Sequence, residues 1–126
     1  MSKYVHPDVQ DGALLVIKNA GTRLLLLSNY SGGMTYAQAV AAALATAVLA
    51  PTDSAITAVG GARVLTIAAG KTATLSAAAT GTDAHVVITD GTARILAVTD
   101  ETSNPTAPVG ATVTFPAIPL TASAAV

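Results

Sequence analysis

Apolar positions recur with a helical period in the first part of this chain and with an extended pattern after it. Pro7 and Asp8 suit the first turn of a helix, and Gly21 suits the position after its last turn. We therefore predict a helix over residues 7–20. Its apolar face would comprise Val9, Ala13, Val16, Ile17 and Ala20, with Leu14 widening it.

A second helix is predicted from its capping residues. Thr35 and Gln38 have the spacing of a capping box, in which the hydroxyl and the amide each satisfy a backbone N–H at the helix start. The helix should therefore begin at Tyr36. The alanines that follow are strong helix formers and carry no stop signal, so we expect an end near Ala43, with residues 44–49 extended.

The rest of the pattern is extended. Apolar runs separated by Gly, Asp, Asn and Pro predict strands at 22–29, 62–70, 71–80, 84–90, 92–100 and 111–121. Pro116 and Pro119 donate no backbone hydrogen bond, so the last strand should lie at an edge or leave the sheet. We predict a mainly β protein, either an antiparallel β-sandwich or a partly open β-barrel, with two short helices in the N-terminal third. It would be a single domain over residues 1–126, with short flexible arms at 1–6 and 121–126.

Residues 85–98, HVVITDGTARILAV, predict a β-hairpin, because β-branched runs flank Asp90-Gly91, a dipeptide typical of two-residue turns. The register implied by that turn is Ile88 with Ala93, Val86 with Ile95, and His85 with Leu96. One face is then wholly apolar and should pack on the core. The other face should meet water or a neighbouring chain.

Composition and charge narrow the classes of partner. Hydrophobic residues make up 52% and charged residues 10%, against about 25% charged residues in a typical domain. The net charge is −1, and the six Lys and Arg are scattered, so we expect no nucleic-acid partner. We expect no membrane partner either. There is no polybasic segment, and the apolar stretch at 37–51 is shorter than the ~20 residues of a membrane span.

Two further absences bear on the chemistry of the protein and on its secretion. The sequence has no Cys, which excludes thiol catalysis, disulfides and Cys-based metal sites. The start, MSKYVHPDVQDG, has no uninterrupted apolar core and no small-residue cleavage site, so no secretion signal is expected.

One short motif resembles part of a phosphate-binding loop. Gly70-Lys71-Thr72 matches the end of that motif, but position 65 is Leu where the loop requires Gly. Extended patterns flank the motif on both sides, where a helix should follow it. We therefore place Lys71 in a connection between strands, with no nucleotide bound.

The remaining titratable residues form no catalytic or metal-binding pattern. His6 and His85 are the two imidazoles, Asp90 lies beyond the strand of His85, and Glu101 is the single Glu. Asn29-Tyr30-Ser31 fits a glycosylation sequon but is interpreted as an ordinary loop, because no secretion signal precedes it. We predict no catalytic, cofactor-binding or metal-binding residue, no cofactor, and no enzyme activity.

The order of these elements resembles a known family. A DGALLVIKNAGTRL helix runs into LLLLS and a TYAQA helix start. GARVLTIAA, ATGTDAHVVITDGTARILAVT and the ending VTFPAIPL follow. Together, over nearly the whole chain, these segments resemble small virion proteins of tailed bacteriophages of the capsid decoration, or cement, type. The Ala-rich middle matches that pattern poorly, since it is more helical and less polar.

The resemblance implies a role on the virion. The chain would be made in the host cytoplasm, bind the major capsid protein on the outer surface of the shell at subunit junctions, and stabilise that shell. The alternative is an adhesive β-domain of a tail or fibre. The low charge predicts a homo-oligomer. We favour a trimer, although capsid shells also offer two-fold sites.

Overall fold

The structure is a computed structural model that describes residues 6–81, 83–100 and 106–122. It is mainly β, with 44% strand and 22% helix, and all its strand pairs are antiparallel. The helices are α1 (Pro7–Ala20), α2 (Tyr36–Ala42) and the 3-10 turn η1 (Pro51–Asp53). The strands are β1 (Arg23–Ser28), β2 (Ala45–Val48), β3 (Ser54–Val59), β4 (Ala62–Ile67), β5 (Thr72–Thr74), β6 (Ala79–Thr80), β7 (Ala84–Thr89), β8 (Ile95–Asp100), β9 (Thr106–Ala107), β10 (Thr112–Thr114) and β11 (Ile118–Ala122).

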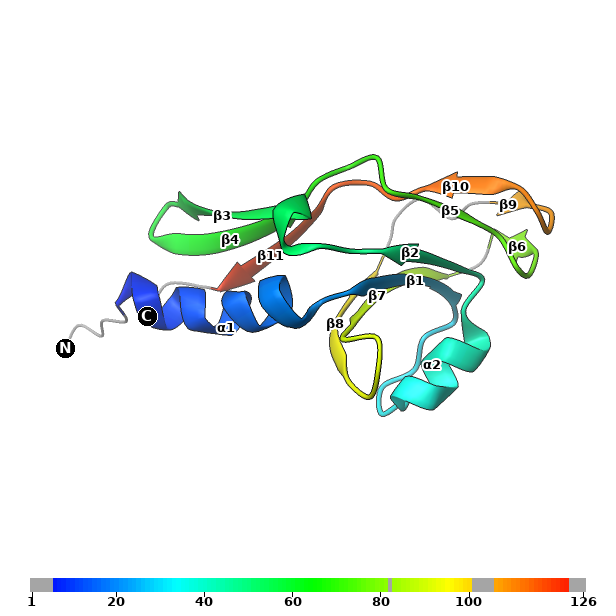
Figure 1. Ribbon diagram of the computed structural model, residues 1–126, viewed down its shortest axis with the longest axis horizontal. Helices are drawn as coiled ribbons and strands as arrows, with labels where there is room; N and C mark the ends of the chain where they lie inside the picture. The colour runs from blue at the N-terminus through cyan, green and yellow to red at the C-terminus, as the bar shows by residue number, and fades with distance from the viewer. Residues whose placement is uncertain (1–5, 82, 101–105, 123–126) are drawn as a thin grey trace.

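One layer is a long antiparallel ribbon made from two chain segments. Residues 62–80 supply β4, β5 and β6, which pair in turn with β11, β10 and β9 from residues 106–122. Backbone hydrogen bonds from Gly70 to Phe115 and from Phe115 to Lys71 join the first two pairs across their interruption. β3 extends one end of the ribbon, giving the strand order β11-β4-β3 (Figure 1).

The second layer combines a sheet with a helix. Four strands in the order β2-β1-β7-β8 form the sheet, and α1 runs directly into β1 (Figure 1). α1 packs across β4, β11 and β3, so it takes the place of a second sheet beneath that end of the ribbon. α2 contacts β1 on the outer side of the sheet.

The core lies on both faces of the four-stranded sheet. The main cluster joins the inner face, including Leu24, Val86 and Ile88, to Leu75 and Phe115 of the ribbon segments. A smaller cluster on the outer face contains Leu25, Leu27, Ala39 and Val87. The described strands close no barrel, so the predicted mainly β, sandwich-like fold with two helices is confirmed.

The predicted helices and the first strand are confirmed. α1 covers residues 7–20 as predicted, and the strand predicted at 22–29 is β1. Thr35 and Gln38 form both hydrogen bonds of the capping box, and α2 ends at Ala42 with Ala43 as its C-cap. Residues 45–48 of the following segment form β2.

The strand predictions were incomplete. β3 was not predicted from the sequence, although Gly60-Gly61 between β3 and β4 is a strong hairpin signal. Both glycines have positive φ, as a two-residue turn of this type requires. The strand predicted at 71–80 is split into β5 and β6, and the one at 111–121 into β10 and β11. β11 contains Pro119 and lies at a sheet edge, as predicted.

The hairpin at 85–98 exists, but its two-residue turn and its register were wrong. Ile88 pairs with Ala97 and His85 with Asp100, and β8 begins only at Ile95. The reason is the Asp90 side chain, whose Oδ1 accepts backbone N–H bonds from Thr92, Ala93 and Arg94. Those residues are therefore held in a loop and cannot join the ladder. The outer face of the hairpin is also covered, because Val87 and Thr89 are fully buried.

Three of the residues assigned to the predicted flexible arms belong to helices or strands. His6 is the N-cap of α1, while Thr121 and Ala122 belong to β11 and pair with Val64 and Arg63. These three residues are therefore parts of elements. The other positions assigned to the arms, residues 1–5 and 123–126, lie outside the described residues.

Candidate functional site

The first candidate site is the outward face of α1, and its position follows from how the helix is anchored. Asp11 forms a bidentate ion pair with Arg63 of β4, with N–O distances of 2.6 and 3.0 Å. This pair raises the pKa of Arg63 above its ordinary value. Lys18 Nζ donates to the backbone carbonyls of Pro51 and Ser54. These polar contacts turn the side of α1 that carries Asp11 and Lys18 toward the ribbon.

The predicted apolar face of α1 is consequently not the buried one. Leu14 is 4% exposed and Gln10 is 7% exposed, so these two residues face the protein. Val9 is 66% exposed and Val16 is 49% exposed, although the periodicity placed both in the core. The helix is thus rotated by about one residue step, roughly 100°, from the predicted orientation.

The outward face of α1 is therefore an apolar surface, which we define by Val9, Gly12, Ala13 and Val16. All four residues are exposed. A Cβ added at Gly12 would meet no atom within 4 Å, so the middle of this surface is open. α2 covers the outer side of the neighbouring sheet, but no described element covers this side of α1 (Figure 1). An uncovered apolar helix face is typical of a surface that binds another chain.

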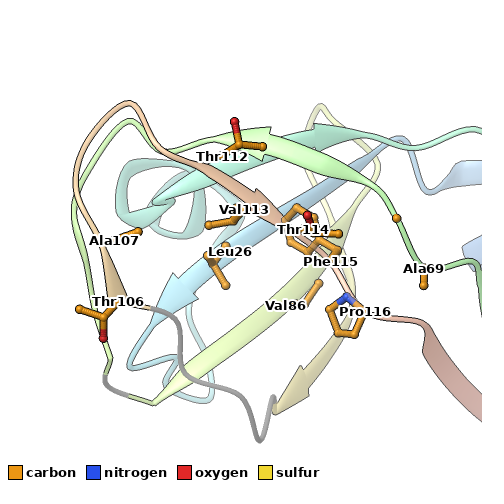
Figure 2. Close-up of a pocket in the computed structure, with 11 residues that line it drawn as sticks. Leu26, Ala69, Val86, Thr106, Ala107, Thr112, Val113, Thr114, Phe115 and Pro116 are labelled. Carbon is orange, nitrogen blue, oxygen red and sulfur yellow. The ribbon is translucent and has the colours of Figure 1, made fainter.

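The second candidate is a cavity of about 780 Å³ between the two layers. Leu26 of β1 and Val86 of β7 form one side, and Val113 and Phe115 of the ribbon form the other (Figure 2). Its eleven lining residues include no Asp, Glu, His, Lys or Arg. The cavity can hold an apolar group, but the described lining supplies no side chain for acid–base chemistry.

The third candidate is a cluster of three titratable side chains at one end of the β7–β8 hairpin. The cluster contains Asp83, His85 and Asp100. Each offers one atom that could bind a metal ion, and these three atoms lie within 4.8 Å of one another. His85 Nδ1 is 2.9 Å from the Asp83 carbonyl oxygen, and Nε2 is 3.9 Å from Asp100 Oδ1. The Tyr30 ring packs at a centroid distance of 5.8 Å from the His85 ring. The two carboxylates can pair with a protonated imidazole.

These three residues were not predicted to lie together, because the predicted hairpin register was wrong. A two-residue turn places His85 opposite Leu96, whereas the observed loop places it opposite Asp100. The signal that could have found the cluster is the loop sequence Asp90-Gly91-Thr92 itself, since an Asp side chain can accept hydrogen bonds from the residue two positions on and so hold a longer turn. Asp90, which lies beyond the strand of His85 in the sequence, takes part in that loop instead.

The other residues weighed from the sequence lie in ordinary structural positions. Lys71 is in the connection between β4 and β5, as predicted, and its Nζ is 2.7 Å from Asp53 Oδ2. That hydrogen bond, together with one from the Ala50 backbone N–H, lowers the pKa of Asp53. Asn29 lies in the loop after β1 in a left-handed conformation, with φ of 60°. Glu101 lies outside the described residues.

Comparisons with protein-family models, with curated proteins and with solved structures find no match to this chain. Among the described residues, neither α1 nor α2 has the length and hydropathy needed to cross a membrane.

Proposed function

We propose that this chain is a bacteriophage capsid decoration protein that binds the major capsid protein on the outer surface of the shell and stabilises it. The observation that carries the proposal is a surface with few charges and several exposed apolar side chains. Seven large apolar side chains of the described residues are exposed, on a chain with only 10% charged residues. The resemblance to small virion proteins supplies the partner.

The positions of these side chains support binding to more than one neighbour. Three of them lie on α1, and the other four are Val40 of α2, Val48 of β2, Val59 of β3 and Val109 in the loop before β10. They are therefore distributed over helices, strands and a loop. A protein that covers a seam between capsid subunits needs such contacts on several sides, whereas a catalytic protein needs a converging set of polar groups.

The expected mechanism is the burial of seams under many uncharged contacts. Such contacts exclude water from the junction, and heating must break them before the capsid subunits separate. Exposed ion pairs contribute little to this mechanism, because the surface offers few charges. Binding should therefore survive high salt.

The test is to add purified protein to shells of the encoding phage that lack it, and to measure shell melting by scanning calorimetry. We expect a higher melting temperature with the protein than without it. Cosedimentation with shells should persist at ~1 M salt, where the Debye length is about 3 Å. Loss of binding at that salt concentration would overturn the apolar mechanism.

An unchanged melting temperature with bound protein would overturn the stabilising role. Binding to host cells without binding to shells would favour the adhesive tail or fibre domain. Lysozyme is a suitable added protein for the control experiment, since it reports any effect of crowding or surface adsorption on the shell transition.

A further inference from the structure

We propose that the outward apolar face of α1 binds the same face of a second copy of this chain, as an antiparallel helix pair around a two-fold axis. This pairing specifies how the expected homo-oligomer forms. It rests on the proposed function only for the expectation that the chain self-associates. It assigns an occupant to the one face of α1 that the described fold leaves bare.

The outward apolar face of α1 is complementary to itself. Place the two-fold axis between Gly12 and Ala13, with the helices antiparallel. Gly12 then lies opposite Ala13 of the second copy, and Val9 lies opposite Val16 of the second copy. The small residues allow the helix backbones to approach closely at the centre, and the valines fill the space on either side. All four residues are exposed in the single chain.

The charges around the face also favour an antiparallel pair. Asp8 has the most exposed charged side chain on α1, at 89%, and it belongs to the first turn. In the antiparallel pair it lies beside Asn19 near the C-terminal end of the other helix, whose amide can donate to it. The two Asp8 carboxylates lie far apart, near opposite ends of the pair. The opposed helix dipoles also place each positive N-terminal end beside a negative C-terminal end. A parallel pair would instead align the two helix dipoles and place both Asp8 carboxylates at the same end of the pair.

The size of the face indicates how the pair should behave. α1 has 14 residues and is about 21 Å long, so a single helix pair buries less than the ~1,200 Å² of a standard stable interface. We therefore expect reversible association that increases with protein concentration. On a shell the copies are held near one another, and their high effective concentration would favour the pair. A self-complementary face makes two-fold pairs, so a trimer would require a different surface.

The natural absence of cysteine allows a direct test by disulfide crosslinking of single-cysteine variants in solution. In the proposed pair, residue 13 lies close to residue 13 of the second copy, so Ala13→Cys should form a disulfide dimer under mild oxidation. Two residues at position 9 would be about 10 Å apart along the axis, beyond the ~7 Å Cα separation that a disulfide spans. Val9→Cys and Val16→Cys should each form no disulfide-linked dimer alone. A mixture of the two should yield the mixed dimer.

A non-covalent measurement completes the test. Val16→Asp should abolish the concentration-dependent dimer in sedimentation velocity, with an unchanged circular dichroism spectrum. Val109→Asp is the matched control, since Val109 is 62% exposed in a loop away from α1 and its change should leave the dimer intact.

Each alternative outcome is distinguishable. A Val9→Cys homodimer would indicate parallel helices, and the absence of any Ala13→Cys dimer at high concentration would overturn the pairing. Because no shell is present, these results leave the decoration role untouched. Conversely, an intact α1 pair with no effect on shell melting would contradict the decoration role alone.

Discussion

At the scale of single residues, Asp90 shows how one side chain can set the geometry of a hairpin. Its carboxylate accepts three backbone N–H bonds from the loop, and it also pairs with the Arg94 guanidinium at 2.9 Å. The bond from Ala93 is the largest of the effects that hold the pKa of Asp90 far below its ordinary value, followed by those from Arg94. The charged form therefore stabilises the folded state.

This depressed pKa predicts an acid-dependent loss of stability. A carboxyl whose folded pKa is lowered contributes stability above its unfolded pKa of about 3.9 and loses that contribution as the pH falls below it. Asp90→Ala should lower the urea midpoint at pH 7. Between about pH 5 and pH 2, the urea midpoint of the variant should fall less steeply than that of the wild type. Asp100→Ala, at an exposed carboxyl on the same hairpin, is the control. Parallel pH profiles for the wild type and the Asp90 variant would contradict this account.

Two glycines of α1 and its cap provide an opposed pair of predictions. A Cβ on Gly21 would lie 2.5 Å from the Ile17 carbonyl oxygen and 3.2 Å from Ile88 Cγ2, so Gly21→Ala should cost about 1–3 kcal/mol of unfolding free energy. Gly12 has open space around it, and Gly12→Ala should stabilise the helix by about 0.5–1 kcal/mol. Urea denaturation at low protein concentration measures both changes. Equal effects of the two substitutions would show that the tight approach at Gly21 is absent.

At the scale of elements, the sequence located α1 and α2 accurately because their signals are local. Caps, proline and glycine positions and periodicity determine where a helix begins and ends. The rotation of α1 depends instead on partners distant in sequence, above all Arg63 for Asp11 and the Pro51 and Ser54 carbonyls for Lys18. No local pattern contains that information. The outward apolar face was therefore mistaken for the core-facing one, and the candidate binding surface was missed with it.

The rotation of α1 can be measured directly with two truncations. If Leu14 faces the protein, Leu14→Ala should cost about 2–5 kcal/mol. Val16→Ala should change the unfolding free energy by no more than about 0.5 kcal/mol, because Val16 is exposed. Urea midpoints distinguish the orientations, since the periodicity-based prediction gives Val16 a substantial core contribution. A larger loss at Val16 than at Leu14 would restore the predicted orientation.

At the scale of the whole molecule, the ribbon of residues 62–80 and 106–122 joins both ends of the structure. The sequence predicted most of its strands, but the pairing of two distant segments depends on long-range register, which turn residues alone do not specify. The cavity and the His85 cluster also result from such pairing. Local sequence patterns therefore established the fold class but not the candidate sites.

The continuous ribbon predicts that the protein unfolds as one unit. α1 packs at one end of the ribbon and the half-buried Tyr30 lies near α2 at the other. Far-UV circular dichroism and tyrosine fluorescence should therefore give coincident urea transitions. Two separated midpoints would divide the chain into independent units and contradict the single-domain prediction.

The position of β3 has a consequence for aggregation of the purified protein. It lies at the end of the order β11-β4-β3, so one side of its backbone has no neighbouring strand among the described residues. Its sequence, SAITAV, contains no charge and no proline, the two features that commonly discourage edge-to-edge pairing. Heated or concentrated preparations should therefore begin to form intermolecular β-structure at this strand. Ala55→Lys, at an exposed position, should delay thioflavin T-positive aggregation, whereas the same substitution at exposed Ala41 of α2 should not.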